Sequence, residues 1–213
     1  MNTDTTGVLE IGARGEGHLR DAGKSFAPAP DDVFVPRSLI DGAGLVTGAT
    51  VRGPIRGGRK GPVLAKVLSV CGLTPTAFRG RTPFGDLQAL NPERRFELGA
   101  GGDPALRIVD LVAPVAHGTR GLIVAPPRTG KTKLLESLAH AIHADAPEAR
   151  IVVLLIDERP EEVTHFRRQV PAEVLASSSD QSAKSHVRLA EMCLAQARCE
   201  LECGHDVVIL VDS

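Results

Sequence analysis

The segment Gly121-Leu-Ile-Val-Ala-Pro-Pro-Arg-Thr-Gly-Lys-Thr132 is the strongest indication of fold in this chain. Its first residues, Gly121 to Ala125, form a short apolar run that predicts a strand, and a helical spacing of apolar residues begins after Lys131. The residues between them match the phosphate-loop pattern G-x-x-x-x-G-K-[ST], with Ala125 in place of the first glycine. A strand, this loop and a helix together predict a site where backbone amides and a helix N-terminus surround phosphate groups.

Three residues of this segment carry the expected chemistry. Gly130 lets the backbone pass close to phosphate oxygens, Lys131 is placed to reach the β- and γ-phosphates, and the Thr132 hydroxyl is a ligand for Mg²⁺. The alternative, a basic helix start that matches by chance, is disfavoured by the strand–loop–helix context.

Two further apolar runs each end in an acid. Ile151 to Ile156 is followed by Asp157 and Glu158, and Val207 to Val211 is followed by Asp212. Because ligands of open parallel sheets bind at the carboxyl ends of the strands, both acids are expected to face the phosphate loop. Asp212 fits a magnesium-site acid, and Glu158 fits a general base that orients and deprotonates water. A helix-capping carboxylate is the alternative for each, and the nearby phosphate loop favours nucleotide chemistry.

The elements between these runs alternate. A helix is expected from Pro160, a strand from Glu173 to Ser177, and a long helix from about Ser182 to Cys203. Alternating strands and helices predict a mostly parallel sheet with right-handed crossovers. Residues 106–213 are therefore predicted to form an α/β domain, and the sequence ends directly after its last predicted strand.

The first 75 residues have a different character. They are rich in Gly and Pro, and short apolar runs are separated by turn clusters, which predicts strands at Gly7–Ile11, Asp32–Val35, Ala49–Gly53 and Val63–Val67. Short strands with glycine-rich turns indicate a small β-barrel over residues 1–75. Residues 76–105 show no sustained period and are predicted to be a linker with local structure.

Composition limits the class of protein. The 213 residues include 25 Lys+Arg and 26 Asp+Glu, and 42% hydrophobic against 24% charged residues is typical of a soluble globular protein. No apolar run is long enough for a membrane span and no signal peptide is visible, so a cytoplasmic protein without membrane contact is expected. The four cysteines are predicted to be reduced thiols, and their spacing disfavours a metal cluster with His205. Near-neutral charge excludes a protein that coats nucleic acid through bulk charge, but leaves room for a local basic groove.

The motifs together resemble the bacterial transcription termination factor Rho family. The resemblance rests on the phosphate-loop segment, on Leu154-Leu-Ile-Asp-Glu-Arg-Pro-Glu-Glu-Val-Thr164, on Val208-Ile-Leu-Val-Asp-Ser213, and on Gly7–Ile11 and Gly17–Arg20 near the N-terminus. It extends from about Gly7 to Ser213. The Leu154–Thr164 segment is highly specific, whereas the phosphate loop alone would indicate only an NTPase.

The resemblance implies an OB-like, cold-shock-like barrel followed by a partial RecA-like P-loop NTPase domain. It also implies an RNA-dependent ATPase and helicase that uses ATP and Mg²⁺, binds single-stranded RNA and assembles as a homohexamer. Such a protein translocates along transcripts and releases them from RNA polymerase, in the company of elongation factors.

The resemblance also assigns site residues by position. Catalytic roles fall on Glu158 and Lys131, and magnesium contacts on Thr132 and Asp212. Nucleotide contacts fall on Ala116, His117, Gly118, Thr119, Arg120, Gly121, Arg128, Thr129, Gly130, Lys131, Thr132, Lys133 and Arg159. RNA contacts fall on Gly15, Glu16, Gly17, His18, Leu19, Arg20, Asp32, Val33, Phe34, Arg59, Lys60 and Gly61.

The barrel departs from the family at its base-stacking positions, which hold Glu16, His18, Phe34 and Gly61. Stacking of a base on an aromatic side chain is worth about 1–3 kcal/mol, and only Phe34 keeps a full aromatic ring. Glu16 would repel a phosphate backbone. The basic stretch from Arg52 to Lys66 is either a phosphate contact or a solvated hairpin face. We therefore expect a weakened or altered primary RNA site.

The family also continues beyond the point where this sequence ends. The resemblance assigns to that part the channel loops that grip RNA and an arginine that reaches the ATP of a neighbouring subunit. A fragment of a longer protein is favoured over a degenerate paralogue, and the chain alone is expected to bind ATP weakly without turning it over. The alternatives are a non-catalytic RNA- or nucleotide-binding remnant and another ring ATPase. The Glu158–Glu162 run and the barrel disfavour the ring ATPase.

Overall fold

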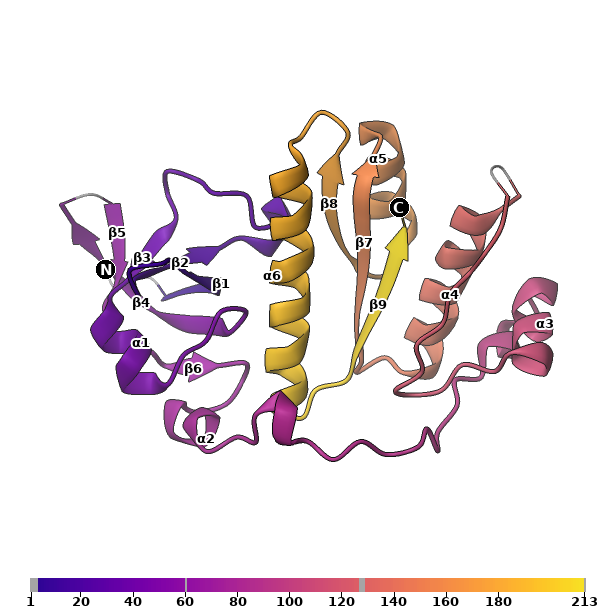
Figure 1. Ribbon diagram of the computed structural model, residues 1–213, viewed down its shortest axis with the longest axis horizontal. Coiled ribbons are helices and arrows are strands. Elements are labelled where there is room, and N and C mark those ends of the chain that lie inside the picture. The colour runs from indigo at the N-terminus through magenta and orange to yellow at the C-terminus, as the bar shows by residue number, and fades with distance from the viewer. Residues whose placement is uncertain (1–3, 60, 127–128, 213) are drawn as a thin grey trace.

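The computed structural model describes residues 4–59, 61–126 and 129–212. It consists of an N-terminal β-barrel and a C-terminal α/β layer, with one long helix, α6 (Ala183–Glu202), between them. Figure 1 shows α6 standing with the barrel on one side and the parallel sheet on the other.

Five strands close the barrel in the order β1-β2-β3-β5-β4, and β1 pairs with β4 to complete the circle. Their bounds are β1 (Asp4–Ile11), β2 (Gly17–Arg20), β3 (Val33–Val35), β4 (Thr50–Gly58) and β5 (Gly61–Leu64). A short strand β6 (Ser69–Val70) also pairs with β4, and helix α1 (Arg37–Ala43) follows β3. The predicted small barrel is confirmed. Strand β2 was not among the four predicted runs, because only Leu19 of its four residues is apolar.

The barrel interior is closed by apolar side chains from all around the circle. Leu9, Val35, Val51 and Leu64 are fully buried, and Phe78 of helix α2 (Pro75–Arg79) packs against the same core. Alternation along the strands explains the pattern, since every second residue of a barrel strand faces inward.

The second sheet has three parallel strands in the order β8-β7-β9. The central strand β7 (Arg150–Glu158) lies between β8 (Glu173–Ser178) and β9 (Val207–Asp212). It is covered on both faces: Val152 and Leu154 pack towards α6, whereas Val153 and Leu155 pack towards helix α5 (Pro160–Gln169). Burial on both sides is why this strand is a continuous apolar run in sequence.

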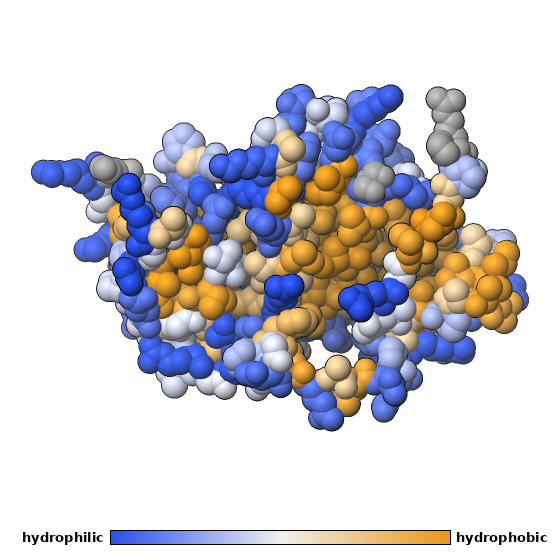
Figure 2. Space-filling model, in the orientation of Figure 1, coloured by the Kyte–Doolittle hydropathy of each residue, from blue (hydrophilic) through white to orange (hydrophobic). Residues whose placement is uncertain are grey.

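The segment 121–126 corrects one prediction. Gly121 to Ala125 was predicted to be a strand, but it pairs with no strand in the described part of the chain, and Leu122 and Val124 are 87% and 85% exposed. An apolar run becomes a strand only where a sheet edge is within reach. Among the described strands β9 pairs only with β7, so its other edge is open, and Figure 2 shows apolar side chains gathered over this part of the sheet.

Residues 76–105 contain several short structured elements. They include most of α2, 3₁₀ turns at Phe84–Asp86 and Leu98–Gly101, and the start of helix α3 (Pro104–Val112). Phe96 and Leu98 are buried together with Leu106 of α3 and Leu135 of helix α4 (Lys131–Asp145). The second half of this connection is therefore part of the core around α4. Within the described residues, no helix combines the length and apolar character needed to cross a membrane.

The barrel and α6 approach each other closely. A Cβ atom on Gly48 would lie 2.2 Å from the carbonyl carbon of Ala195, and the positive φ of 91° at Gly48 also favours glycine there. Val8 and Phe26 of the barrel side share a buried core with Leu189 and Met192 of α6. The two layers are thus held as one packed unit by a helix that has barrel contacts on one face and sheet contacts on the other.

Candidate nucleotide-binding site and RNA interface

The start of α4 and the end of β9 meet at a charged cluster. Helix α4 begins at Lys131, preceded by Gly130 with φ 96°. The Lys131 Nζ lies 2.7 Å from Asp212 Oδ1, and the Thr132 hydroxyl donates to Asp212 Oδ2 over 3.3 Å. The hydrogen bond and the charge of buried Asp212 raise the pKa of Lys131. The structure therefore brings together three of the residues singled out in the sequence.

A β-bulge at the end of β7 sets the direction of the Glu158 side chain, the fourth predicted site residue. The pairing of β7 with β8 shifts register between Ile156 and Glu158, and Asp157 between them has a positive φ of 61°. A slip of one residue moves a side chain to the opposite face of a sheet. Asp157 Oδ1 accordingly lies 4.0 Å from His186 of α6, while Glu158 interacts electrostatically with Lys131 and Asp212. Left-handed backbone at a non-glycine residue is costly and is found preferentially at functional sites.

Glu158 lies among other carboxylates. Burial is the largest cause that raises its pKa, to about 7, followed by a hydrogen bond with Glu162 and by the charges of Glu162 and Asp212. Lys131 opposes this shift. A carboxyl group with a pKa near neutrality can accept a proton from water at working pH, which is what a general base requires. Glu162 was not predicted as a site residue. Its position in the first turn of α5, shortly after Glu158, is the sequence signal that could have identified it.

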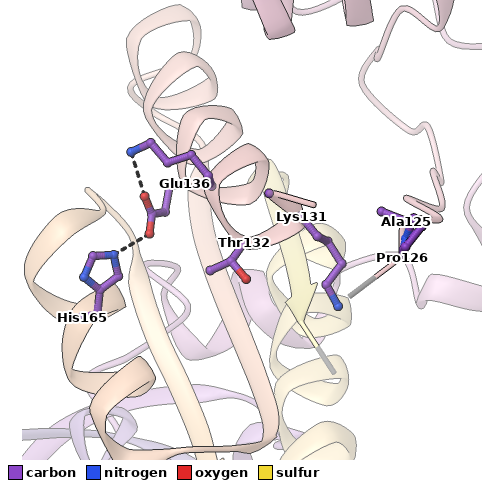
Figure 3. Close-up of a pocket in the computed structure, with 8 residues that line it drawn as sticks. Ala125, Pro126, Lys131, Thr132, Glu136 and His165 are labelled. Carbon is purple, nitrogen blue, oxygen red and sulfur yellow. Dashed lines mark hydrogen bonds and ion pairs between the residues drawn. The ribbon is translucent and has the colours of Figure 1, made fainter. Parts of the chain in front are cut away.

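A cavity of about 720 Å³ opens beside this cluster. Figure 3 shows residues that line it, of which Glu136 and His165 point towards each other from α4 and α5. The carboxylate of buried Glu136 holds Lys133 Nζ at 2.9 Å and His165 Nε2 at 2.6 Å. Lys133, assigned by resemblance to the nucleotide, is thus directed at Glu136 in this structure. The lining residues are Ala125, Pro126, Gly130, Lys131, Thr132, Lys133, Glu136 and His165.

The remaining residues assigned to the nucleotide are not all brought to this cluster. The Thr129 hydroxyl donates to the Pro126 carbonyl over 2.7 Å, Arg159 is exposed at the start of α5, and Arg128 lies outside the described residues. His117 stacks on Phe96 and lies 3.7 Å from Asp206, which precedes β9 at the end opposite to Asp212. His117 therefore lies away from Lys131 here.

The oxygen donors at the end of β9 fit a magnesium ion. Mg²⁺ prefers one or two protein oxygens together with phosphate and water, and the Thr132 hydroxyl and Asp212 carboxylate are adjacent. In the described part of the chain, no three His, Cys, Asp or Glu side chains are placed to hold a metal by themselves. The donor set is therefore suited to an ion that arrives with a nucleotide rather than to a protein-only metal centre.

The barrel carries the predicted RNA residues on two faces. His18 of β2 and Phe34 of β3 are cross-strand partners, with ring centroids 5.7 Å apart and planes inclined by 70°. Gly15 and Glu16 precede β2, and the exposed Arg59 and half-buried Gly61 lie at the β4–β5 hairpin, where Lys60 is outside the described residues. Gly17, Leu19 and Val33 are instead buried in the barrel. The side chains of Leu19 and Val33 face the core and cannot contact a ligand unless the barrel opens.

Arg20 and Asp32 take part in an ion-pair ladder that sequence reasoning missed. Arg20 contacts Asp32 and lies 2.6 Å from Glu10, and Glu10 in turn lies 2.6 Å from Arg188 of α6. Burial raises the pKa of Glu10, but the two guanidinium groups more than offset it and hold that pKa below its usual value. These ion pairs connect strand β2 of the barrel to α6, the helix that packs on the sheet. No sequence signal identified Glu10 or Arg188, since the pairing spans segments far apart in the chain.

Comparison with known proteins agrees with this two-part geometry. Residues 5–76 match the model of the Rho termination factor RNA-binding domain, and residues 105–213 match the nucleotide-binding domain of the ATP synthase alpha/beta family. The chain belongs to the Rho family. The matched ranges correspond to the barrel and to the sheet with its helices.

Similar curated proteins are called transcription termination factor Rho. The one from Streptomyces coelicolor is 47% identical over 98% of this chain and 49% of its own length. Those from Haemophilus influenzae and Cereibacter sphaeroides are 44% and 42% identical over 97% of this chain and 51% of their own length. The chain therefore spans about half the length of the Rho relatives it matches.

The raised pKa of Glu158 leads to a pH-dependent stability for this Rho-family chain. The folded carboxyl group keeps its proton up to about pH 7, whereas an unfolded one releases it near 4.5. The contribution of this group to the free energy of unfolding is therefore fully present below pH 4.5 and is lost as the pH rises through 7. Glu158→Gln, which cannot ionise, is expected to be more stable than the wild type by about 1–2 kcal/mol at pH 8, after allowance for solvent screening.

Thermal unfolding at pH 5 and pH 8 without nucleotide checks this expectation. The gap between Glu158→Gln and the wild type should widen from pH 5 to pH 8. Glu161→Gln removes an exposed carboxylate in the first turn of the same helix and serves as the control, with little change. A variant less stable than the wild type at pH 8 would contradict the like-charge cluster.

Proposed function

We propose that this chain is the RNA-binding and ATP-binding part of an RNA-dependent ATPase that translocates along nascent transcripts and releases them. The observation that carries the proposal is the β-bulge at Asp157, which turns Glu158 towards the Lys131–Asp212 cluster. A barrel that matches an RNA-binding domain and a sheet that matches a nucleotide-binding domain support it. The names of the relatives support transcript termination as the process.

The proposed hydrolysis is an in-line attack of water on the γ-phosphate of ATP. Lys131 binds phosphate oxygens and offsets their charge, which requires it to exchange its contact with Asp212 for the nucleotide. Glu158, with its pKa near 7, orients the attacking water and takes up its proton. Bound Mg²⁺ supplies neutralisation of the phosphate charge, and Thr132 and Asp212 are the residues that would hold it.

Single-stranded RNA is the proposed polymer ligand of the barrel. Phe34 and His18 offer adjacent ring surfaces, and exposed Arg56 and Arg59 on the β4–β5 hairpin offer positive charge to the backbone. We also propose, from the family resemblance of the sequence, a homohexamer in the cytoplasm that contacts RNA polymerase and elongation factors. The domain limits 1–75, 76–105 and 106–213 are likewise part of the proposal, although Phe96 and Leu98 of the middle segment pack into the second core.

RNA-stimulated ATP hydrolysis tests this function. We would compare the 213-residue chain with the same chain extended by the residues that follow the aligned region in the Streptomyces coelicolor relative. The expected result is RNA-stimulated turnover in the extended protein and none in the chain alone. Glu158→Gln in the extended protein should lower the rate by about 10²–10⁴-fold, the usual contribution of a general base.

The second candidate is a non-catalytic RNA- and nucleotide-binding module. The specific observation in its favour is that segment 121–126, which precedes the phosphate loop, pairs with no described strand. RNA binding without turnover in both the chain and its extended form would favour this candidate. Robust turnover by the chain alone would contradict the expectation that further residues are required.

A further inference from the structure

Three thiols meet where the barrel contacts α6. Cys71 follows β6 of the barrel, and Cys199 and Cys203 lie one turn apart near the end of α6. The sulfur atoms of Cys71 and Cys199 are 3.5 Å apart, although the two residues are separated by 128 positions in sequence. Both are buried, whereas Cys203 is half-buried. Neither the nucleotide site nor the RNA face uses any of these groups.

The backbone holds Cys71 in an uncommon conformation. Its φ is 46°, in the left-handed region that non-glycine residues rarely adopt. Its N–H donates to the Thr50 carbonyl over 2.8 Å, and its own carbonyl lies 3.0 Å from His205 Nε2, in the turn after α6. Contacts from the barrel and from the α6 side therefore fix the direction in which the Cys71 side chain points.

The chemistry of the pair is asymmetric. The two sulfur atoms share a hydrogen bond in which either thiol can be the donor. This bond lowers the pKa of Cys71 to about 7 against the opposing effect of burial. The same bond raises the pKa of Cys199. The thiolate is the form of cysteine that attacks oxidants and disulfides, so Cys71 is the nucleophile of the pair and Cys199 is the neutral partner next to it.

We propose that Cys71 and Cys199 are a peroxide-sensitive thiol pair, which oxidation converts into a disulfide that joins the barrel to α6. The Cys71 thiolate attacks one oxygen of hydrogen peroxide, the O–O bond breaks, and sulfenic acid forms. The departing hydroxide takes up the proton that the Cys71 thiol released, which gives the first water. The Cys199 sulfur then attacks the Cys71 sulfur, the S–O bond breaks and the second water leaves. Two thiols lose two electrons and two protons, and one peroxide is reduced to two waters.

The position of the pair gives the bond a mechanical consequence. A disulfide here would tie the barrel to the last turn of α6, and a short connection leads from that turn into β9 and to Asp212. The sulfur atoms would have to approach by about 1.5 Å to reach bonding distance, a small movement for side chains already in contact. The oxidised form would therefore fix the barrel on the helix that leads into the strand of Asp212.

Oxidation of the folded chain with hydrogen peroxide tests the proposal. After treatment, free thiols are alkylated, the protein is digested without reduction, and linked peptides are identified by mass spectrometry. The expected result is loss of two of the four thiols, a Cys71–Cys199 linked peptide, and full reversal by dithiothreitol. The oxidised chain should also unfold at a higher temperature than the reduced chain.

Serine variants of the two paired cysteines test the assignment, and Cys193 on α6 gives the matched control. Cys71→Ser and Cys199→Ser should both abolish the disulfide, whereas Cys193→Ser should leave it unchanged. Cys193 is also buried on α6, but it packs in a different core, with Val152 and Met192. Because a serine variant can fail to fold, the peptide map of the wild type decides independently. A Cys71–Cys203 or Cys193 linkage, a disulfide only between two chains, or sulfinic acid without a disulfide would each overturn the proposal.

Discussion

Replacing Arg150 by methionine is expected to lower the free energy of unfolding by about 3 kcal/mol. Arg150 begins β7 and is surrounded by polar partners from two other elements. Its guanidinium group lies 2.7 Å from Glu173 Oε2 of β8 and 3.2 Å from Glu200 Oε2 of α6. It also donates to the side-chain oxygen of Gln196 on α6 over 2.8 Å.

The expected loss comes from the partners rather than from the arginine itself. Without it, the carboxylates of Glu173 and Glu200 would remain in a partly buried region with no cation to offset them, which is the costly way to break an ion pair. The second oxygen of Glu173 is already buried without a hydrogen-bond partner among the described residues. Gln196 also donates to the Thr50 hydroxyl of the barrel over 3.3 Å, so the same network reaches both layers.

Urea unfolding at pH 7 measures this effect. Arg167→Met removes an exposed arginine near the end of α5 and should change stability by less than about 0.5 kcal/mol. Arg150→Lys keeps the charge but loses the forked donor geometry, so we expect an intermediate loss, and this variant remains informative if Arg150→Met does not fold. A methionine variant as stable as the wild type would show that the network adds nothing to stability.

The elements that are buried in the structure were the ones that could be predicted from the sequence. Residues 151–156 could be predicted as a strand because both faces are covered and every residue is apolar. The helices at Pro160–Gln169 and Ala183–Glu202 carried clear start signals, and the structure confirms them. The segment 121–125 has equally apolar residues but lies on no sheet edge here. Local composition cannot show whether a pairing partner is present, and this is why that prediction was wrong.

The candidate site shows a similar division. Lys131, Thr132 and Asp212 could be placed together because a phosphate loop is expected to lie at the carboxyl ends of parallel strands, where Asp212 ends β9. The bulge at Asp157 could not be predicted, since nothing in Leu154–Glu158 breaks the strand pattern. The pairing of Glu136 with His165, and of Glu10 with Arg188, depends on how separate helices and strands pack. Sequence periodicity describes one element at a time and carries no information on such contacts.

Lys131→Ala is expected to weaken the binding of Mg²⁺-ATP by about 10–100-fold. A hydrogen bond to a charged group contributes about 1.5–3 kcal/mol, and about 1.4 kcal/mol corresponds to a factor of ten in affinity. Lys131 stands at the start of α4 with its ammonium group at the open cavity, and in the absence of nucleotide it contacts buried Asp212 at 2.7 Å. Titration with a fluorescent ATP analogue up to millimolar concentration gives the affinity.

The neighbouring Lys133 provides the matched control for this measurement. Its side chain is 79% exposed and contacts Glu136 at 2.9 Å, on the side of the cavity formed with His165. Lys133→Ala should therefore change ATP affinity only by the amount of an exposed ion pair, about 0.2–1 kcal/mol. Urea unfolding of both variants separates lost binding from lost stability, because Lys131→Ala also removes the ion pair of Asp212. Loss of binding in Lys133→Ala with unchanged binding in Lys131→Ala would place the nucleotide at Glu136 and His165 instead.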